Sequence, residues 1–290
     1  MLIIDAHAHV YSDNDSRYPP VPNPVRPPGE TGSFLKLQAI SKSNGVEGIC
    51  IVQPGTFYRW DNRFLCDLSK AFFRHTSGIC SLDPDDSNSC RRLKRHVKQS
   101  GVRGLRSYPA ADGHLNHPGV RALWKAAGEE GITINVFIGS DRVDELAQMF
   151  EIFPRQPVVI DHCLISQPNG ELNRAIENML RLAKFPNAYA KLSFLPLGSA
   201  EEYPFRDMHD PCMRIIAAFG ADRCVWGSNF PCELWTPKSS YAQNLRLFTY
   251  ELGLQDAARE AILGQTASRL WFRDKLPGRD TKGIHQCRSV

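Results

Sequence analysis

Eight short apolar segments alternate with amphipathic segments along this chain, and the alternation restricts its fold more than any other feature. The apolar segments are residues 2–10, 48–54, 77–83, 102–108, 132–138, 157–163, 188–194 and 223–231. Strands that alternate with helices form crossover units and therefore a parallel sheet. Because eight such units are what a closed barrel requires, the sequence predicts an α/β fold, the (β/α)8 or TIM barrel. A doubly wound open sheet is the alternative, but no Gly-x-Gly-x-x-Gly motif follows any predicted strand.

Helices are predicted between the strands, where apolar residues recur at helical spacing. They cover residues 33–44, 62–75, 88–99, 118–130, 141–153, 171–185 and 208–219, and two closing helices cover 239–251 and 255–271. A chain of 290 residues is long for an ordinary domain but suits one such barrel. We therefore predict a single-domain barrel over residues 1–272 and a polar C-terminal tail over residues 273–290.

Charge and hydropathy exclude several classes of partner. The net charge of +4 is small for this length, and the densest basic run, residues 91–98, has its apolar residues at the spacing of a solvated helix face. No apolar stretch reaches the roughly 18 residues that a membrane span needs. We therefore expect a small-molecule substrate and neither nucleic acid nor a membrane as partner. The sequence carries no signal for the oligomeric state.

The cysteines indicate the compartment. Nine cysteines without a Cys-x-x-Cys pair argue against a disulfide framework, because the number is odd. Cys50, Cys80, Cys163 and Cys224 fall within predicted buried strands, where a free thiol packs as a small apolar residue. Free thiols favour a reducing compartment. The first residues form a predicted strand that contains an acid and two histidines, which is not the pattern of a signal peptide. These features predict a cytoplasmic protein.

The first predicted strand contains Asp5-Ala-His-Ala-His9. Because alternate side chains of a strand point to the same face, we expect Asp5, His7 and His9 to point into the barrel. The histidines lie toward the carboxyl end of the strand, where parallel barrels build their active sites. Two imidazoles at this spacing can hold a divalent metal, or orient and polarise an oxygen atom. For the proline-rich segment 18–29 that follows, we predict a stiff loop over the mouth of the site.

Further polar residues end other predicted strands on the same side of the barrel. They are Gln53 on the second strand, Arg103 or Arg106 on the fourth, His162 on the sixth, Lys191 on the seventh and Asn229 on the eighth. Each has an ordinary alternative explanation, because a histidine that ends a strand is more often hydrogen-bonded than catalytic and a lysine can extend to solvent. Residues from several strand ends that converge on one place are, however, how this fold makes an active site.

In these motifs the sequence resembles the amidohydrolase superfamily, specifically its amidohydrolase-2 branch and the sugar-lactone and 2-pyrone-4,6-dicarboxylate lactonase subgroup within it. The matching pieces are Asp5-Ala-His-Ala-His9, Val52-Gln53 with Asp61-Asn62, Gly101-Val-Arg-Gly-Leu-Arg106, Ile160-Asp-His162, Ala190-Lys-Leu-Ser193, residues 222–231 and residues 264–270. They follow one another in the family's order to about Trp271. The resemblance implies a barrel, hydrolysis of a small polar molecule, and a site in which His7, His9 and His162 take part.

The sequence departs from this family pattern on two strands. Members usually carry an aspartate on the eighth strand, which takes the proton from the attacking water, where this chain has Asn229. An asparagine has no charge and no useful basicity. The fourth strand carries arginines where a second metal would need a bridging acid or a modified lysine, so we expect no two-metal centre. His7, His9 and His162, and more weakly the oxygen of Asn229, can then hold one ion, zinc or manganese, or none, and metal-independent activity is the alternative.

Three functional hypotheses follow. The first is a hydrolase, a lactonase that opens a sugar-derived or carboxylated lactone. In it, His7 and His9 polarise the carbonyl directly or through one ion, and His162 deprotonates a water that Asn229 orients. Guanidinium groups match carboxylates, and the expected substrate-binding residues are Gln53, Arg103, Arg106 and Lys191. The second hypothesis is a single-metal amidohydrolase or decarboxylase. The third, which Asn229 suggests, is a catalytically silent barrel that acts as a binding protein.

Overall fold

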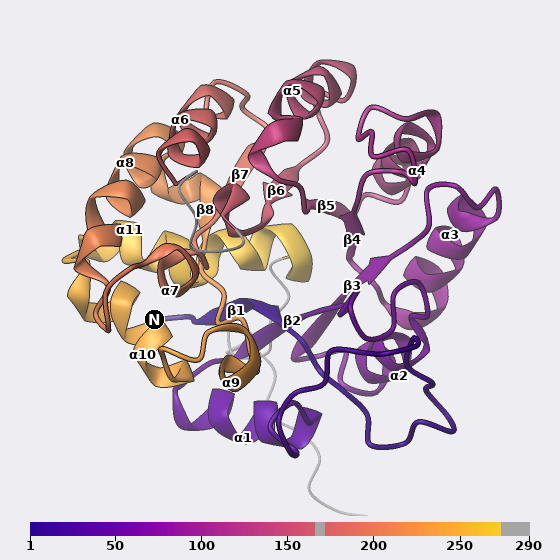
Figure 1. Ribbon diagram of the computed structural model, residues 1–290, viewed down its shortest axis with the longest axis horizontal. Coiled ribbons are helices and arrows are strands. Elements are labelled where there is room, and N and C mark those ends of the chain that lie inside the picture. The colour runs from indigo at the N-terminus through magenta and orange to yellow at the C-terminus, as the bar shows by residue number, and fades with distance from the viewer. Residues whose placement is uncertain (166–171, 274–290) are drawn as a thin grey trace, which may run out of the picture.

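The computed structural model describes residues 1–165 and 172–273 and contains the predicted barrel. Eight parallel strands pair in chain order, from β1 beside β2 through to β7 beside β8. The strands are β1 (Ile4–Ala8), β2 (Gly48–Val52), β3 (Thr76–Ser81), β4 (Gly104–Ser107), β5 (Thr133–Val136), β6 (Val158–Ile160), β7 (Ala188–Lys191) and β8 (Cys224–Val225). Figure 1 shows them at the centre of a ring of helices. The prediction of a (β/α)8 barrel is confirmed.

Backbone hydrogen bonds between β1 and the chain that follows β8 close the barrel. His9 N donates to Phe230 O over 2.8 Å, and Asn229 N donates to His7 O over 2.9 Å. Regular strand geometry covers only Cys224–Val225 of the predicted eighth strand. The irregular chain after it nevertheless lies beside the histidines of β1, which places Asn229 next to them.

Most helices cover the outside of the barrel, and two short ones, α7 (Leu195–Gly198) and α9 (Cys232–Trp235), lie at the carboxyl ends of its strands. The others are α1 (Phe34–Ser43), α2 (Arg63–Ala71), α3 (Ser89–Ser100), α4 (Pro118–Glu129), α5 (Val143–Ile152), α6 (Leu172–Leu182), α8 (His209–Phe219), α10 (Tyr241–Arg246) and α11 (Asp256–Glu260). Ser33 begins α1 because its Oγ accepts the N–H of Lys36 over 3.2 Å. Leu93 and Val97 are buried on α3 while its charged residues lie toward solvent, so the basic run is a helix face.

The apolar core lies in two layers, one inside the barrel and one between the barrel and its helices. Inside the barrel, Ile4 and Ala6 of β1 pack with Cys50 and Val52 of β2. Trp271, from the closing helical segment, belongs to the same cluster and is 1% exposed. Its backbone carbonyl accepts the hydroxyl of Ser77 near the beginning of β3, so this segment covers the amino-terminal end of the barrel. The site is therefore left to the carboxyl ends of the strands.

The sixth strand ends earlier than predicted. β6 stops at Ile160, and His162, Cys163 and Leu164 then adopt φ angles of 54°, 51° and 67°. Left-handed backbone is uncommon for residues other than glycine and persists where the surrounding structure holds it. The turn places Asp161 and His162 at the centre of the site, where both approach β1.

Three further predictions concern the chain as a whole. Residues 274–290, nearly all of the predicted polar tail, lie outside the described residues. The eight cysteines within the described ranges are free thiols. Across the same ranges, we find no helix with the length and apolar character that crossing a membrane requires.

Candidate active site

A cavity of about 470 Å³ opens at the carboxyl ends of the strands, where the fold builds its sites. The residues that line it are His9, Pro54, Gly55, Thr56, Arg59, Trp60, Arg106, Tyr108, Pro109, Phe137, His162, Leu197, Asn229 and Trp235. We call the four buried polar residues among them the floor: His9, Arg106, His162 and Asn229. They come from β1, from β4, from the turn after β6 and from the chain after β8, and all four were singled out from the sequence.

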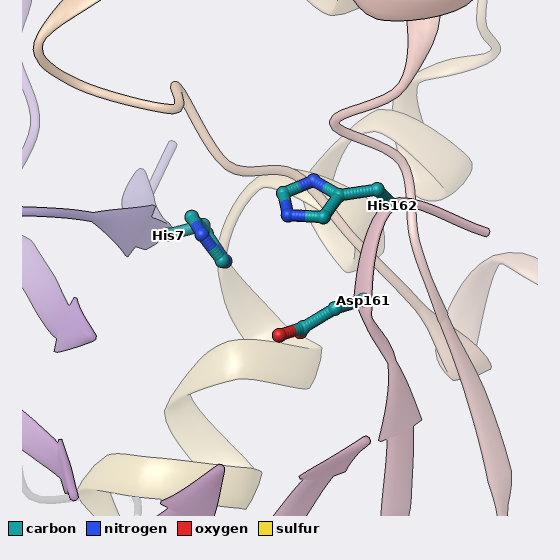
Figure 2. A group of neighbouring side chains, drawn as sticks. All are labelled: His7, Asp161 and His162. Carbon is teal, nitrogen blue, oxygen red and sulfur yellow. The ribbon is translucent and has the colours of Figure 1, made fainter. Parts of the chain in front are cut away.

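His7 lies directly behind the floor and is fully buried. Its Nε2 is 3.1 Å from Nε2 of His9. Its ring meets that of His162 edge to face, with the centroids 4.6 Å apart. Figure 2 shows His7 and His162 pointing toward each other from opposite sides, with Asp161 beside them. The three histidines predicted to meet are therefore neighbours.

Asp5 does not join this group, and the prediction that it shares a face with the histidines is wrong. The pairing of β1 with β2 shifts register between Asp5 and Ala8, which interrupts the alternation of side chains. Oδ1 of Asp5 accepts the N–H groups of His7 and Ser228 over 3.0 and 2.9 Å. Oδ2 accepts the hydroxyl of Tyr241 on α10 over 3.0 Å. Asp5 therefore links β1 to α10 and to the chain after β8.

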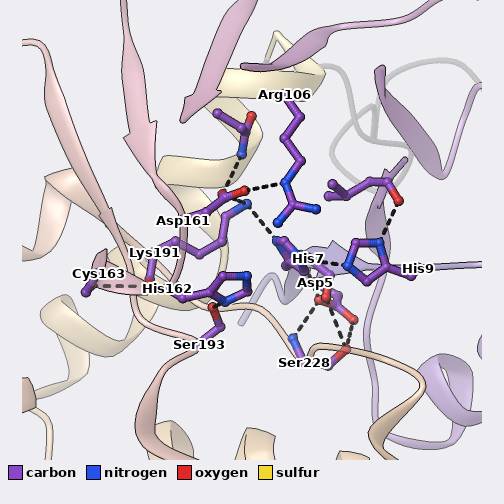
Figure 3. Close-up of polar contacts among 12 residues, drawn as sticks. Asp5, His7, His9, Arg106, Asp161, His162, Cys163, Lys191, Ser193 and Ser228 are labelled. Carbon is purple, nitrogen blue, oxygen red and sulfur yellow. Dashed lines mark hydrogen bonds and ion pairs between the residues drawn. The ribbon is translucent and has the colours of Figure 1, made fainter. Parts of the chain in front are cut away.

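Asp161 is the centre of a buried ionic network (Figure 3). Its Oδ1 lies 2.8 Å from Nζ of Lys191, and its Oδ2 accepts Nε–H of Arg106 over 3.0 Å. Asn135 also donates to Oδ1 over 3.2 Å. Burial alone would raise the pKa of Asp161, but the charges of Lys191 and Arg106 hold it well below its usual range. Burial lowers the pKa of Lys191, and the charge of Asp161 opposes that shift. With Lys191 protonated, two positive charges against one negative leave the network with a surplus of one positive charge.

A hydrogen-bond chain connects this network to the floor. Nζ of Lys191 lies 3.1 Å from Nδ1 of His7, and Nδ1 of His9 lies 2.7 Å from the carbonyl oxygen of Val52. A carbonyl can only accept, so Nδ1 of His9 carries the proton and its Nε2 accepts from His7. The direction of the chain is then set: Lys191 donates to His7, His7 donates to His9, and His9 donates to Val52.

The imidazoles in this arrangement are neutral near pH 7. Burial, helped by the charge of Arg106, lowers the pKa of His9 to about 3. Burial also lowers the pKa of His162 to about 3, although the charge of Asp161 acts in the opposite direction. The pKa of His7 lies well below its ordinary value, first through burial and then through the charge of Lys191. All three rings can therefore act as neutral donors or acceptors.

Ser193, just after β7, holds two floor residues. Its hydroxyl lies 2.8 Å from Nδ1 of His162, and its carbonyl accepts Nδ2–H of Asn229 over 2.9 Å. Oδ1 of Asn229 is buried and has no hydrogen-bond partner among the described residues. Because buried polar atoms are normally paired, this free acceptor beside the cavity suits a water or a ligand hydroxyl.

Three residues predicted to bind substrate lie outside the lining of the cavity. Lys191 is fully buried in the ionic network. Gln53 donates to the carbonyl of Asp61 over 2.6 Å and so holds the loop after β2. Arg103 precedes Gly104, the first residue of β4, so it lies at the amino end of the strand. Of the two arginines that the sequence proposed on this strand, only Arg106 therefore lies toward the carboxyl end and lines the cavity.

The proline-rich segment 18–29 packs against the loop after β2 and does not cover the mouth of the site. None of its residues lines the cavity. Val21 N donates to Phe57 O over 2.8 Å, and Val25 N donates to Thr56 O over 3.2 Å. Thr56 lies in the loop after β2 and lines the cavity. The segment therefore stabilises that loop through the few N–H groups that its prolines leave.

The sequence did not single out Asp161 and Ser193 as functional residues. Both lie in strand-end motifs, one position before His162 and two positions after Lys191. Their place beside predicted site residues was the signal that could have identified them, because residues at the carboxyl ends of strands gather at the site. Their roles depend on partners from other strands, which the motifs do not name.

A metal ion does not fit this set of donors as they are arranged. Ring nitrogens of His7 and His162 and a carboxylate oxygen of Asp161 lie within 4.8 Å of one another, which makes them a candidate metal group. The ammonium group of Lys191, however, contacts both Asp161 and His7. Metal ligands must present lone pairs, and the hydrogen-bond chain uses Nδ1 of His7 and Nε2 of His9 as acceptors. Two residues of the predicted set, His7 and His9, are therefore already engaged in hydrogen bonds, while only Nδ1 of His162 has a partner, Ser193.

The amidohydrolase family profile matches residues 4–273. The D-galactarolactone isomerase of Agrobacterium fabrum is 23% identical over 280 residues, which cover 92% of this chain and 90% of that protein. A Pseudomonas putida structure, described as a candidate 2-pyrone-4,6-dicarboxylic acid hydrolase, has a TM-score of 0.77 at 21% identity and covers 93% of this chain and 97% of its own. A Burkholderia multivorans amidohydrolase with bound zinc has a TM-score of 0.75 at 20% identity, over 93% and 99% of the two chains. The two solved structures therefore share the barrel fold of this chain.

Proposed function

Since this chain belongs to the amidohydrolase family, we propose that it is a hydrolase that opens the ring of a small carboxylated or sugar-derived lactone. The observation that carries the proposal is the floor, where two neutral imidazoles, a guanidinium group and the side chain of Asn229 line one cavity. Such a set can bind an ester, stabilise an oxyanion and handle a proton, which are the needs of acyl transfer. The names of the relatives support a lactone as the ester.

His7 is the proposed donor to the carbonyl oxygen of the lactone. Its Nε2–H donates to His9 in the free protein and can turn to an oxygen that enters beside His9. Lys191 donates to the other nitrogen of the same ring, which favours the tautomer that keeps Nε2 protonated. The surplus positive charge of the network then stabilises the negative charge that develops on this oxygen.

His162 is the proposed base, and Asn229 the residue that orients the water. Ser193 engages Nδ1 of His162, which leaves Nε2 for the proton. A substrate carboxylate on Arg106 would offset the positive charge that depresses the pKa of His162 and so raise its basicity. Water gives its proton to His162 as its oxygen bonds to the carbonyl carbon. The ring C–O bond then breaks, the leaving alkoxide takes the proton, and the product is a hydroxy acid.

Lactone isomerisation is the second candidate, and Asn229 favours it. No carboxylate lines the cavity within the described ranges, so activation of water depends on a weakly basic imidazole. A hydroxyl of the substrate could attack its own carbonyl instead and form a ring of another size. The relative named D-galactarolactone isomerase supports this alternative.

One experiment separates the candidates. We would incubate the protein with a panel of lactones, including D-galactaro-lactones and 2-pyrone carboxylates, and follow the products by NMR. A ring-opened hydroxy acid that appears before any isomer supports hydrolysis, and a second lactone that appears first supports isomerisation. No product from any lactone, with ligand binding retained, would contradict both and favour the binding protein.

Replacement of Asn229 by aspartate is expected to lower kcat/KM by roughly tenfold to a hundredfold. Nδ2–H of Asn229 donates to the carbonyl of Ser193, and a carboxylate there would place two oxygens against each other. Asn244→Asp is the matched control, because Asn244 is buried and donates to the carbonyl of Ser228 over the same 2.9 Å but lies outside the cavity lining. A gain of hydrolysis with Asn229→Asp would instead indicate a silenced ancestral hydrolase.

We expect activity without added metal, because Lys191 supplies the positive charge behind His7. Chelator treatment followed by dialysis should leave kcat/KM and the unfolding midpoint unchanged, and added zinc or manganese should not raise the midpoint. Ligands that bind the folded state stabilise it, so a metal that displaced Lys191 would raise the midpoint measurably. Such a rise, or loss of activity with chelator, would support the single-metal alternative.

A further inference from the structure

We infer that the substrate of this site is a flat, weakly hydroxylated lactone that carries a carboxylate bound by Arg106. The inference rests on the proposed function and narrows it, because it selects conjugated carboxylated lactones over polyhydroxylated sugar lactones. Three features of the cavity carry it: its aromatic rings, the lack of carboxylates and lysines in its described lining, and the surplus charge behind its floor.

Aromatic side chains form much of the cavity lining above the floor. Trp60, Tyr108, Phe137 and Trp235 are all half-buried there. Ring centroids are 5.7 Å apart for Trp60 and Tyr108 and 5.8 Å apart for Tyr108 and Phe137, both in edge-to-face contact. Trp235 packs against His9 with the centroids 5.8 Å apart. We call these four side chains the ring wall, and their exposed surface suits a flat conjugated ligand.

The described cavity lining includes no carboxylate and no lysine. Apart from the floor, its polar groups are the exposed Thr56 and Arg59 and the polar atoms of the aromatic residues, namely the hydroxyl of Tyr108 and the indole N–H groups of Trp60 and Trp235. A sugar lactone carries several hydroxyls, and each one buried without a partner costs about tenfold in affinity. A conjugated lactone ring has few or no hydroxyls and avoids this cost.

Arg106 provides the place for one carboxylate. Its Nε is bonded to Asp161, and its guanidinium carbon lies 4.4 Å from the ring centroid of Phe137. These contacts hold the plane of the group while it lines the cavity. The network behind it carries one uncompensated positive charge, counted over Arg106, Lys191 and Asp161. A carboxylate on the remaining N–H groups balances that charge with paired hydrogen bonds.

The test uses probes that cannot react, so that binding is measured apart from turnover. Calorimetry would compare 2-naphthoate, its uncharged amide 2-naphthamide, and D-galactonate, which has the same charge as naphthoate but many hydroxyls. We expect 2-naphthoate to bind at least about tenfold more tightly than either of the others. Equal or tighter binding of D-galactonate would overturn the inference about the ring wall. Equal binding of the amide would overturn the role of Arg106.

Two variants connect the result to the ring wall. Trp60→Ala, at the half-exposed edge of the cavity, is expected to weaken 2-naphthoate binding about fivefold to tenfold and to leave D-galactonate unchanged. Phe73→Ala is the control, because Phe73 is 66% exposed and lies outside the lining. Equal effects of the two substitutions would contradict stacking on Trp60.

The inference and the proposed function can fail separately. Tight binding of 2-naphthoate without turnover of any lactone would support the inference and contradict the proposed function. Turnover of D-galactaro-lactones with no activity on 2-pyrone-6-carboxylate would support the function and overturn the inference. Turnover of the pyrone, with a KM at least about tenfold lower than for the sugar lactone, would support both.

Discussion

Replacement of Asp161 by asparagine is expected to lower the free energy of unfolding by about 3–5 kcal/mol. The substitution keeps the shape of the side chain but removes the negative charge that lies between Lys191 and Arg106. Two buried cations would then face each other without this counter-ion, and unpaired buried charge is among the most destabilising changes known. Urea unfolding at pH 7.5, followed by circular dichroism, measures the loss.

Two comparisons make this result specific. Asp86 is paired with Arg92 at 2.9 Å near the surface, so Asp86→Asn should leave the free energy of unfolding almost unchanged. Lys191→Met, added to Asp161→Asn, removes one of the unpaired cations and should restore at least about half of the lost stability. If Asp161→Asn proved as mild as Asp86→Asn, the buried network would not be formed as described.

A change of pH from 7.5 to 5.5 is expected to cost at least about 3 kcal/mol of folding free energy, about 1.4 kcal/mol through each of His9 and His162, and His7 adds to this loss. Burial holds the pKa of His9 and His162 at about 3 in the folded protein and lowers that of His7 well below its ordinary value. In the unfolded chain the pKa of each returns to about 6.5. Below that pH the unfolded chain binds protons that the folded protein does not, so stability is full above about pH 7.5 and falls as the pH decreases.

Urea unfolding at half-unit steps between pH 7.5 and 5.5 tests the sign and the size of this effect. His9 accounts for about 1.4 kcal/mol over the interval, so His9→Gln should reduce the loss by about that amount. A free energy of unfolding that stays level over the interval, or rises toward pH 5.5, would show that the three imidazoles are not buried in neutral form.

Much of the fold could be read from the sequence, because periodicity reports which faces of an element are buried. The alternation of apolar runs with amphipathic segments predicted all eight strands and their order around the barrel. Local signals also located the start of α1 at Ser33. The errors lie where local geometry is irregular. The register shift after Asp5 and the left-handed turn at His162 leave no mark on hydrophobic spacing.

The candidate site was predictable in part. His9, Arg106, His162 and Asn229 lie at or beyond the carboxyl ends of their strands, and the structure brings them to one cavity. Lys191 was also recognised as a strand-end residue, but the structure buries it beneath the cavity. A strand-end position shows that a side chain lies near the site. It does not show whether the side chain faces the cavity or the residues behind it.

From its own pattern, the sequence determined the barrel, the end at which a site forms, and most of the polar groups available there. Those properties follow from periodicity and strand polarity, which neighbouring residues specify. The pairing of Asp161 with Lys191 and Arg106, and the direction of the hydrogen bonds through His7, were decided by folding alone. The charge and tautomer of a buried group depend on partners that come from distant strands and on the exclusion of water, and neither exists until the barrel closes.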